Sequence, residues 1–286
     1  MMAIPWNLKP LKAEHCIFIL WLSLITQLSA HAQDTLQAPV LTYSHTLPVS
    51  SPTSISQDRN GYLYVLDNRL NLLRLNPLGH PVDTYSPQGR GRASSIHAWN
   101  PLKIVLFYES SQRLVLLDRF LRPVSSFDII EISNQTISKL AAPAADIGYW
   151  LFNETTLTLS KFNPLARGTT IETPLNLILD QEQLDMRQLR EYQNMVYLLD
   201  YNSGILVFDN LGNYKTRYTY PGVEYMGFKD NEVYFVKGNT LYFLDLYTQK
   251  ERTITLPMRA KYNAALVGAH QLYLFSTKGM DVYTME

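Results

Sequence analysis

Residues 58–79, DRNGYLYVLDNRLNLLRLNPLG, contain two short apolar runs that are joined and bounded by polar turns. The first run, 63–66, ends at Asp67, and the second, 72–75, ends at the turn Asn-Pro-Leu-Gly of residues 76–79. Asn or Asp at the start of a turn and a glycine free to take a positive φ are typical of chain reversals. Short apolar runs between such turns indicate β-strands that are buried on both faces.

The same order of elements recurs along the chain. Residues 196–212, VYLLDYNSGILVFDNLG, repeat the strand, turn, strand and Leu-Gly turn, and a further strand follows both copies. Weaker copies of the strand pair cover residues 103–118, 148–162, 232–245 and 271–283. The second strands of the six copies are centred 37 to 46 residues apart, which matches the length of one propeller blade.

These repeats predict an all-β fold, a six-bladed β-propeller of four-stranded antiparallel blades. A sheet that is apolar on both faces must be covered by neighbouring sheets, and a ring leaves no end sheet uncovered. The last copy lacks a fourth strand, whereas residues 39–46 (PVLTYSHT) form a strand without a partner of their own. We therefore predict that this N-terminal strand closes the ring. Only residues 175–191 approach a helical period.

The stretch 58–67, DRNGYLYVLD, resembles an NHL-type propeller repeat, in which a D-x-x-G-x-(hydrophobic)-Y-V-x-D strand pair recurs. Residues 195–212 resemble the second half of that pattern, and the other copies lack its leading Asp and Gly. The resemblance implies a six-bladed ring with a binding surface on one face. Exported rings of this kind include lyases, lactonase-like hydrolases and non-catalytic interaction modules, so the resemblance does not choose an activity.

The first 32 residues have the pattern of a secretory signal. Lys9 and Lys12 precede an apolar core of 13 residues, 16–28, and small residues at Ala30 and Ala32 form a cleavage site. We therefore predict a signal peptide over residues 1–32, a single propeller domain over 33–286, and a secreted or periplasmic (cell-envelope) location. The core is short for a permanent membrane span, which needs about 20 residues. An uncleaved anchor is the alternative.

The composition excludes two classes of protein. The chain has 25 basic and 25 acidic residues, and 12% of its residues are aromatic, with 19 tyrosines. Disordered chains combine few aromatics with a large net charge, and nucleic-acid-binding domains are strongly basic. The single cysteine, Cys16, lies in the predicted signal. The mature chain is therefore predicted to have no disulfide, no thiolate nucleophile and no cysteine-based metal site.

In a propeller, the turns between second and third strands share one face with the loops between blades, and loops on a rigid scaffold are where function usually lies. Four oxygen-bearing side chains on this face could together ligate Ca²⁺. They are Asp67, Glu109, Asn153 and Asp200. The alternative is that Asp67 and Asp200 only begin turns, as Asx residues do. None of the four histidines outside the predicted signal is spaced as a paired metal ligand.

The link between the first two blades, residues 85–100 (YSPQGRGRASSIHAWN), contains no acidic residue. Arg90 and Arg92 beside flexible glycines suit recognition of a carboxylate or phosphate, and solvated surface arginines are the alternative. We expect Trp99 to pack in the core. Residues 180–185 (DQEQLD) are expected to form a short helix or lid over the same face, which could pair with these arginines, or a solvated loop.

We predict a non-enzymatic binding module that holds a protein, peptide or glycan ligand on the loop face around the central channel. Its predicted ligand-binding residues are Arg90, Arg92, Glu109 and Asp200. No catalytic residue, metal site or cofactor is predicted, since the sequence has neither a G-x-S-x-G elbow nor a glycine-rich phosphate loop after a strand. One alternative is a Ca²⁺- or Zn²⁺-dependent hydrolase or lyase on the same ring, and another is a structural part of an envelope assembly. We predict no nucleic-acid partner and no permanent membrane span.

Overall fold

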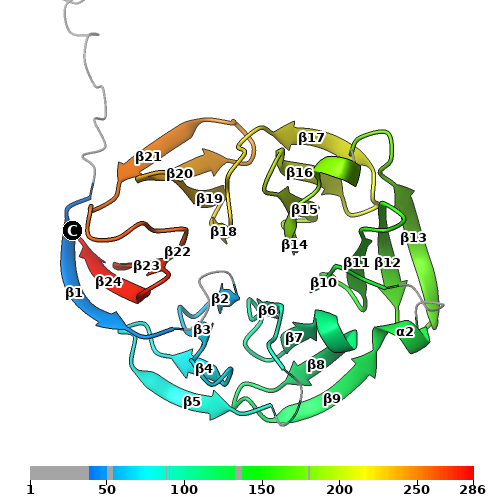
Figure 1. Ribbon diagram of the computed structural model, residues 1–286, viewed down its shortest axis with the longest axis horizontal. Coiled ribbons are helices and arrows are strands. Elements are labelled where there is room, and N and C mark those ends of the chain that lie inside the picture. Colours follow the sequence, from blue (N-terminus) through cyan, green and yellow to red (C-terminus); the bar gives the residue numbers. More distant parts are fainter. Residues whose placement is uncertain (1–38, 50–53, 88, 90, 133–136, 180) are drawn as a thin grey trace, which may run out of the picture. The chain divides into compact units, whose positions relative to one another are not determined.

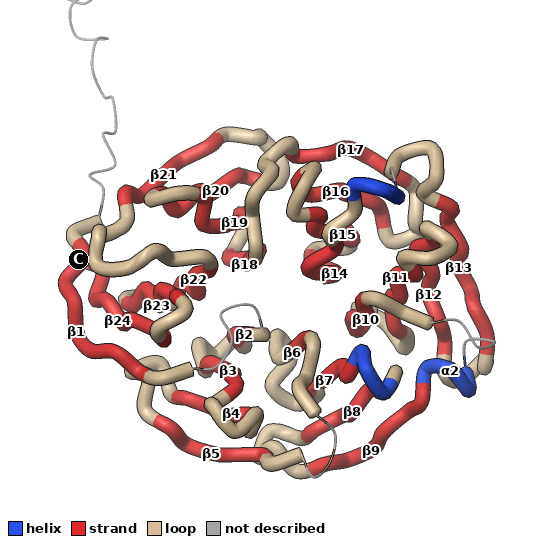
Figure 2. The backbone as a smooth tube through the Cα atoms, viewed as in Figure 1, coloured by secondary structure: helices blue, strands red, loops and turns tan. Residues whose placement is uncertain are grey.

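The computed structural model describes residues 39–49, 54–87, 89, 91–132, 137–179 and 181–286. These residues form six four-stranded antiparallel sheets around a central axis, as the blades of a propeller (Figure 1). The predicted all-β six-bladed fold is confirmed. Helix in this part of the chain is limited to α2 (Ile129–Ile132) and the 3₁₀ turns η1 (Glu109–Ser111) and η2 (Gln181–Gln183) (Figure 2).

Each blade runs from a strand beside the central axis to a strand at the rim. The innermost strands of blades 1 to 6 are β2 (Ile55–Gln57), β6 (Ser95–His97), β10 (Leu140–Pro143), β14 (Met186–Tyr192), β18 (Met226–Lys229) and β22 (Ala264–Val267). The second strands are β3 (Leu63–Leu66), β7 (Ile104–Tyr108), β11 (Tyr149–Asn153), β15 (Met195–Asp200), β19 (Glu232–Lys237) and β23 (Gln271–Ser276). The third strands are β4 (Leu72–Leu75), β8 (Arg113–Leu117), β12 (Thr158–Asn163), β16 (Gly204–Asp209), β20 (Thr240–Asp245) and β24 (Gly279–Met285). The outer strands are β5 (Pro81–Tyr85), β9 (Pro123–Asp128), β13 (Gly168–Pro174), β17 (Tyr214–Tyr218), β21 (Glu251–Thr255) and β1 (Leu41–Leu47).

The hydrophobic core is divided among the interfaces between blades. The described residues form six buried apolar clusters, and each cluster joins the facing sides of two neighbouring sheets. Between blades 3 and 4, for example, Trp150 and Phe152 belong to the same cluster as Val196 and Leu198. All residues of β3 and β7 are buried. The continuous apolar runs in the sequence therefore reflect coverage on both faces, as predicted.

The N-terminal strand closes the ring inside blade 6. β1 pairs with β24 in antiparallel register from Leu41 opposite Met285 to Leu47 opposite Met280. The backbone groups of Val40 and Glu286 exchange two further hydrogen bonds, of 3.0 and 3.1 Å. The strand without a partner and the blade without a fourth strand thus complete each other, as predicted.

The helical period of residues 175–191 does not produce a helix beyond the single 3₁₀ turn η2. From Met186 the chain belongs to β14, in which Met186, Leu189 and Tyr192 are buried. A bulge between Met186 and Gln188 shifts the register of this strand. The bulge puts Met186 and Leu189, three residues apart, into the cluster shared with blade 3, whereas Tyr192 is buried on the opposite face in the cluster shared with blade 5. Together these two effects give a spacing of three, which resembles a helical period. Among the residues described, none of the helices has the length and hydropathy needed to cross a bilayer.

Candidate functional site

Antiparallel order gives the ring two different faces. Turns between first and second strands, and between third and fourth strands, lie on one face, which we call the turn face. Turns between second and third strands lie on the other, together with the connections between blades, and we call this the loop face. The predictions from the sequence put the site on the loop face.

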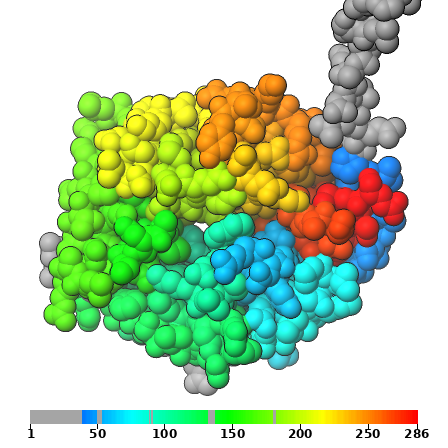
Figure 3. Space-filling model, turned by 180° about the vertical axis from the view of Figure 1, so that it is seen from behind, coloured from blue at the N-terminus to red at the C-terminus, as the bar shows by residue number. Residues whose placement is uncertain are grey.

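The structure has a cavity of about 580 Å³ on the turn face, near the central channel. It is formed by Arg59 of the β2–β3 turn, residues between 97 and 103 around the β6–β7 turn, residues 143–146 of the β10–β11 turn and residues 190–194 around the β14–β15 turn. Four blades therefore contribute to it. The space-filling view from behind shows an opening near the centre of the ring (Figure 3). The volume of the cavity lies within the usual range for small-molecule sites.

Asx turns fix the two cationic residues at the rim of the cavity. The buried Asp58 side chain accepts the backbone N–H groups of Asn60 and Tyr62, which holds the tight turn that carries Arg59. Burial raises the pKa of Asp58, and the hydroxyl of Tyr64 donates to its other oxygen over 3.1 Å. In the next blade, the Asn100 side chain accepts the backbone N–H of Leu102 over 3.1 Å, and the Asn100 backbone carbonyl oxygen accepts the backbone N–H of Lys103 over 3.0 Å.

An aromatic wall borders one side of the cavity. Trp99 contacts Tyr192 edge-on with ring centroids 5.7 Å apart, and Tyr192 stacks on Phe228 at 4.7 Å. The hydroxyl of Tyr192 donates to the carbonyl oxygen of Asp230 over 2.7 Å, which fixes the ring. The prediction that Trp99 packs in the core is wrong, since 44% of its surface is exposed. Trp99 lies in the β6–β7 turn, where it lines the cavity.

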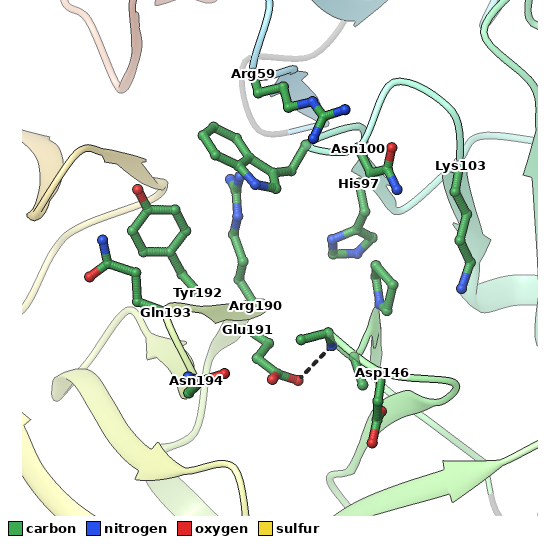
Figure 4. Close-up of a pocket in the computed structure, with 14 residues that line it drawn as sticks. Arg59, His97, Asn100, Lys103, Asp146, Arg190, Glu191, Tyr192, Gln193 and Asn194 are labelled. Atoms are coloured by element: carbon green, nitrogen blue, oxygen red, sulfur yellow. Dashed lines mark hydrogen bonds between the residues drawn. The ribbon is translucent and has the colours of Figure 1, made fainter.

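Three of the charged groups in the cavity are cationic, and the two acidic side chains are engaged within the protein. Asp146 forms an ion pair with Lys161 at 2.8 Å. Glu191 accepts the indole N–H of Trp150 over 2.6 Å and the backbone N–H of Ala145 over 3.1 Å (Figure 4). Arg190 extends from β14 into the cavity, with Arg59 and Lys103 on other sides (Figure 4).

His97 lies between Arg190 and Lys103 and is held in the neutral form (Figure 4). Burial, and secondly the positive charge of Arg190, lower the pKa of His97 to about 4. Its Nε2 lies 2.9 Å from the carbonyl oxygen of Ala141, an acceptor, so Nε2 carries the proton. Burial also lowers the pKa of Lys103, against the opposing effect of Asp146.

Three of the four residues predicted to bind a ligand, Arg92, Glu109 and Asp200, lie on the loop face, away from this cavity. Arg92 is exposed, and Arg90 lies outside the described residues. Glu109 forms an ion pair with Lys139 at 3.0 Å, between blades 2 and 3. Asp200 is buried and accepts the backbone N–H groups of residues 185, 202 and 203, so it has the predicted alternative role of an Asx residue. A ligand-binding role for these residues stays a prediction.

The proposed oxygen ligands of a calcium ion are likewise engaged in turns or ion pairs. Asp67 accepts three hydrogen bonds from residues 69 and 71, and Asn153 accepts the backbone N–H groups of Thr155 and Thr156. In the part of the chain that the structure describes, no three His, Cys, Asp or Glu side chains are grouped so that they could hold a metal ion. The metal-dependent hydrolase or lyase stays a prediction.

A second feature of the turn face is repeated in blades 1 to 5. Each turn between third and fourth strands begins with an Asn or Asp whose side chain accepts the backbone N–H two residues later. The donating residue is always large, apolar and exposed. These five apolar turn tips are Leu78 (56% exposed), Phe120 (47%), Leu165 (76%), Leu211 (67%) and Tyr247 (70%).

Sequence reasoning missed Arg59, Arg190 and the aromatic wall. Arg59 belongs to the stretch 58–67 that resembles an NHL-type repeat, and Arg190 lies near the end of the segment 175–191 that approaches a helical period. The available signal is their position, since Arg59 lies in the turn after the innermost strand β2 and Arg190 lies near the end of the innermost strand β14. Four such turns meet beside the channel once the ring is formed.

The fold and the site define the class, a six-bladed β-propeller with a cationic cavity on its turn face. No protein-family model matches the sequence, and no curated protein matches it. Among solved structures, a streptogramin B lyase aligns with 89% of this chain and 100% of its own, at 9% identity and a TM-score of 0.62. A catalytically inactive virginiamycin B lyase from Staphylococcus aureus with quinupristin aligns with 81% of this chain and 80% of its own, at 9% identity and a TM-score of 0.54.

The WD40 domain of Neurospora crassa Pan2 aligns with 83% of this chain and 89% of its own, at 8% identity and a TM-score of 0.51. At these identities the likeness establishes the propeller fold alone. The six-bladed ring that the NHL-type resemblance implied is confirmed, while the NHL type itself stays a prediction.

Proposed function

We propose that this protein is an exported, non-enzymatic binding module that docks a protein or peptide partner on its turn face. The pattern of residues 1–32 supports export, and these residues lie outside the described part of the chain. The observation that carries the docking proposal is the set of five apolar turn tips, which occur on the face that also has the cavity and its aromatic wall.

The repetition of the tips is the reason for assigning them to binding. An Asx turn requires Asn or Asp at its first position and places no demand for an apolar side chain two residues later. Single exposed apolar residues are ordinary on a protein surface. Five at one structural position on one face are better explained by contact with a partner, because apolar and aromatic groups are enriched at the buried centres of protein interfaces.

Site-specific photo-crosslinking in the host tests the choice of face. A photoreactive residue in place of Leu165 or Leu211 samples the turn face, and the same residue in place of Leu177 or Met258 samples the loop face. Leu177 and Met258 are 94% and 91% exposed, so they are at least as accessible as the tips. We expect discrete protein adducts from the turn-face positions alone.

Adducts from the loop-face positions alone would overturn the docking proposal. They would instead support the surface predicted from the sequence, around Arg92, Glu109 and Asp200. Replacement of Arg92 by Glu would then be expected to remove those adducts.

A further inference from the structure

We infer that the cavity on the turn face is a carboxylate-binding site, which receives an acidic side chain or a chain terminus of the partner beside Arg190. This inference rests on the proposed function, since it names the chemistry by which the docked partner is held. Its physical basis is a set of positive charges without counter-ions.

Each of the three cationic side chains of the cavity lacks an ion-pair partner in the described part of the chain, although Asp146 acts on Lys103 from a greater distance. Arg59, Lys103 and Arg190 form no ion pair with any carboxylate among the residues that the structure describes. The two acidic residues of the cavity are already occupied, Asp146 by Lys161 and Glu191 by donors from blade 3. The cavity therefore has a local excess of positive charge in a chain that is neutral as a whole.

Arg190 is the residue for which an anionic ligand matters most. Its guanidinium lies 5.4 Å from the ring centroid of Phe228 and is only partly exposed. The buried hydroxyl of Tyr225 lies beside Arg190, whose charge and hydrogen bonding lower the pKa of Tyr225 against the larger effect of burial, but this neutral hydroxyl is no counter-ion for the guanidinium. A cation taken partly out of water and left without a counter-ion is costly, so a bound anion would relieve this cost.

The rest of the cavity favours a carboxylate carried on an apolar or aromatic framework. The planar fork of a guanidinium matches the two oxygens of a carboxylate. Trp99 and Tyr192 supply an aromatic wall next to this charge. A cavity of about 580 Å³ has the size of a small-ligand site and so has room for a short part of a peptide. Neutral His97 adds no charge, and a bound anion would favour its protonated form.

Hippurate, an aromatic amide with one carboxylate, and hippuramide, its neutral amide, form a matched pair of probes. We expect the mature protein to bind hippurate at least tenfold more tightly than hippuramide in calorimetric titration, and the affinity to fall as salt is added. Arg190→Gln should weaken hippurate binding at least tenfold, and Arg59→Gln should weaken it less. Arg69→Gln, on the loop face, should leave it unchanged. The histidine NMR signal of His97 should shift to a higher pKa in the complex.

Several results would overturn the inference. Equal binding of hippurate and hippuramide, or an Arg190→Gln protein that melts normally and still binds hippurate as before, would remove the carboxylate site. If Arg190→Gln does not fold, the other two measurements test the site. Unchanged hippurate binding by Arg59→Gln together with an unchanged pKa of His97 in the complex would then remove the carboxylate site. Tighter binding of inorganic phosphate than of hippurate would replace the carboxylate by a phosphate group.

The carboxylate site and the docking surface can fail separately. If adducts form at Leu165 and Leu211 and are unaffected by hippurate or by Arg190→Gln, docking stands and the carboxylate inference falls. If hippurate binds as expected but no turn-face adduct forms, the docking proposal falls. If hippurate prevents the adducts at Leu165 and Leu211, the result supports both the carboxylate site and the docking surface.

Discussion

Alkaline unfolding tests the packing between blades that gives the cavity its walls. Ten of the 19 tyrosines are buried, and burial raises the pKa of nine of these above the ordinary value of about 10. The nine are Tyr64, Tyr149, Tyr192, Tyr197, Tyr225, Tyr234, Tyr262, Tyr273 and Tyr283. For Tyr149, whose pKa shift has burial as its only cause, the value rises to about 12.

The direction of the change in stability follows from the difference between the tyrosine pKa in the folded protein and in the unfolded chain. A group with a higher pKa in the folded protein than in the unfolded chain stabilises the fold fully below pH 10, and this contribution is lost as the pH rises. At pH 11 the unfolded chain gains about 1.4 kcal/mol from a tyrosine such as Tyr149, which ionises in the folded protein only at a pKa of about 12. The pKa values of the other eight shift in the same direction, so their contributions add to that of Tyr149, and a few of this size are a large part of the stability of an ordinary domain, about 5–15 kcal/mol. We therefore expect cooperative unfolding near pH 11.

The assay follows tyrosinate absorbance and far-ultraviolet circular dichroism during the same titration. Exposed tyrosines should ionise first, and the buried set should ionise together with the loss of the β signal. Tyr149→Phe should reduce the loss of unfolding free energy at pH 11 by about 1 kcal/mol. Tyr247→Phe, at a position that is 70% exposed, is the matched control and should leave it unchanged. Ionisation of all 19 tyrosines in one step near pH 10, with the β signal intact, would refute the packing.

Three other perturbations test the ring and its sites. A chain beginning at Pro48 lacks β1, so it loses six paired positions and the packing of Leu47 on the core. We expect this loss to lower the free energy of unfolding by ~3 kcal/mol or more and the melting temperature by about 6–12 °C, relative to a chain beginning at Pro39. Equal melting temperatures would contradict closure of the ring by β1. His97 has a lowered pKa in the folded protein, so stability present above about pH 6.5 should fall by ~3 kcal/mol as the pH is lowered to 4, because the unfolded chain takes up the proton near pH 6.5 and the folded protein only near pH 4. Urea unfolding of the His97→Gln protein should lack this loss. Asp200→Ala should destabilise the protein by about 2–4 kcal/mol, because three backbone N–H groups lose their acceptor. Asp200→Asn, which keeps one side-chain oxygen, should destabilise it less. An unchanged urea midpoint in Asp200→Ala would contradict the turn-forming role and leave ligand binding as the role of Asp200.

The sequence predicts the fold well because each blade is encoded locally. An apolar run of four to six residues, an Asx residue and a turn glycine are enough to mark a strand pair, and the structure has a second strand at every predicted centre. Gly79 and Gly212 adopt a φ of 83°, as the Leu-Gly turns require. Closure of the ring was also predictable, because the last repeat lacked a fourth strand and the N-terminal strand lacked a partner, and pairing the two satisfies both.

The site was less predictable because its residues are distant in the sequence and lie in or beside turns of similar sequence. Arg59, Lys103 and Arg190 come from three blades, and only the ring brings them to one cavity. Trp99 is of a residue type that is usually buried, and its exposure depends on its place in the β6–β7 turn. The loop face was chosen because loops on a rigid scaffold often carry function, and the ligand-binding role of that face stays a prediction beside the cavity on the turn face.

The cavity is assembled by contacts in which one blade holds the residues of the next. The backbone N–H of Arg59 donates to the carbonyl oxygen of Trp99, joining the turns of blades 1 and 2. His97 of blade 2 bonds to Ala141 of blade 3, and Glu191 of blade 4 accepts the Trp150 indole of blade 3. Since every wall depends on a neighbouring blade, the width of the cavity is set by the angle between blades, and hence by the number of blades that closure fixes. A ligand that separates or draws together these turns must work against the packing of the whole ring, so the cavity is preorganised for its occupant.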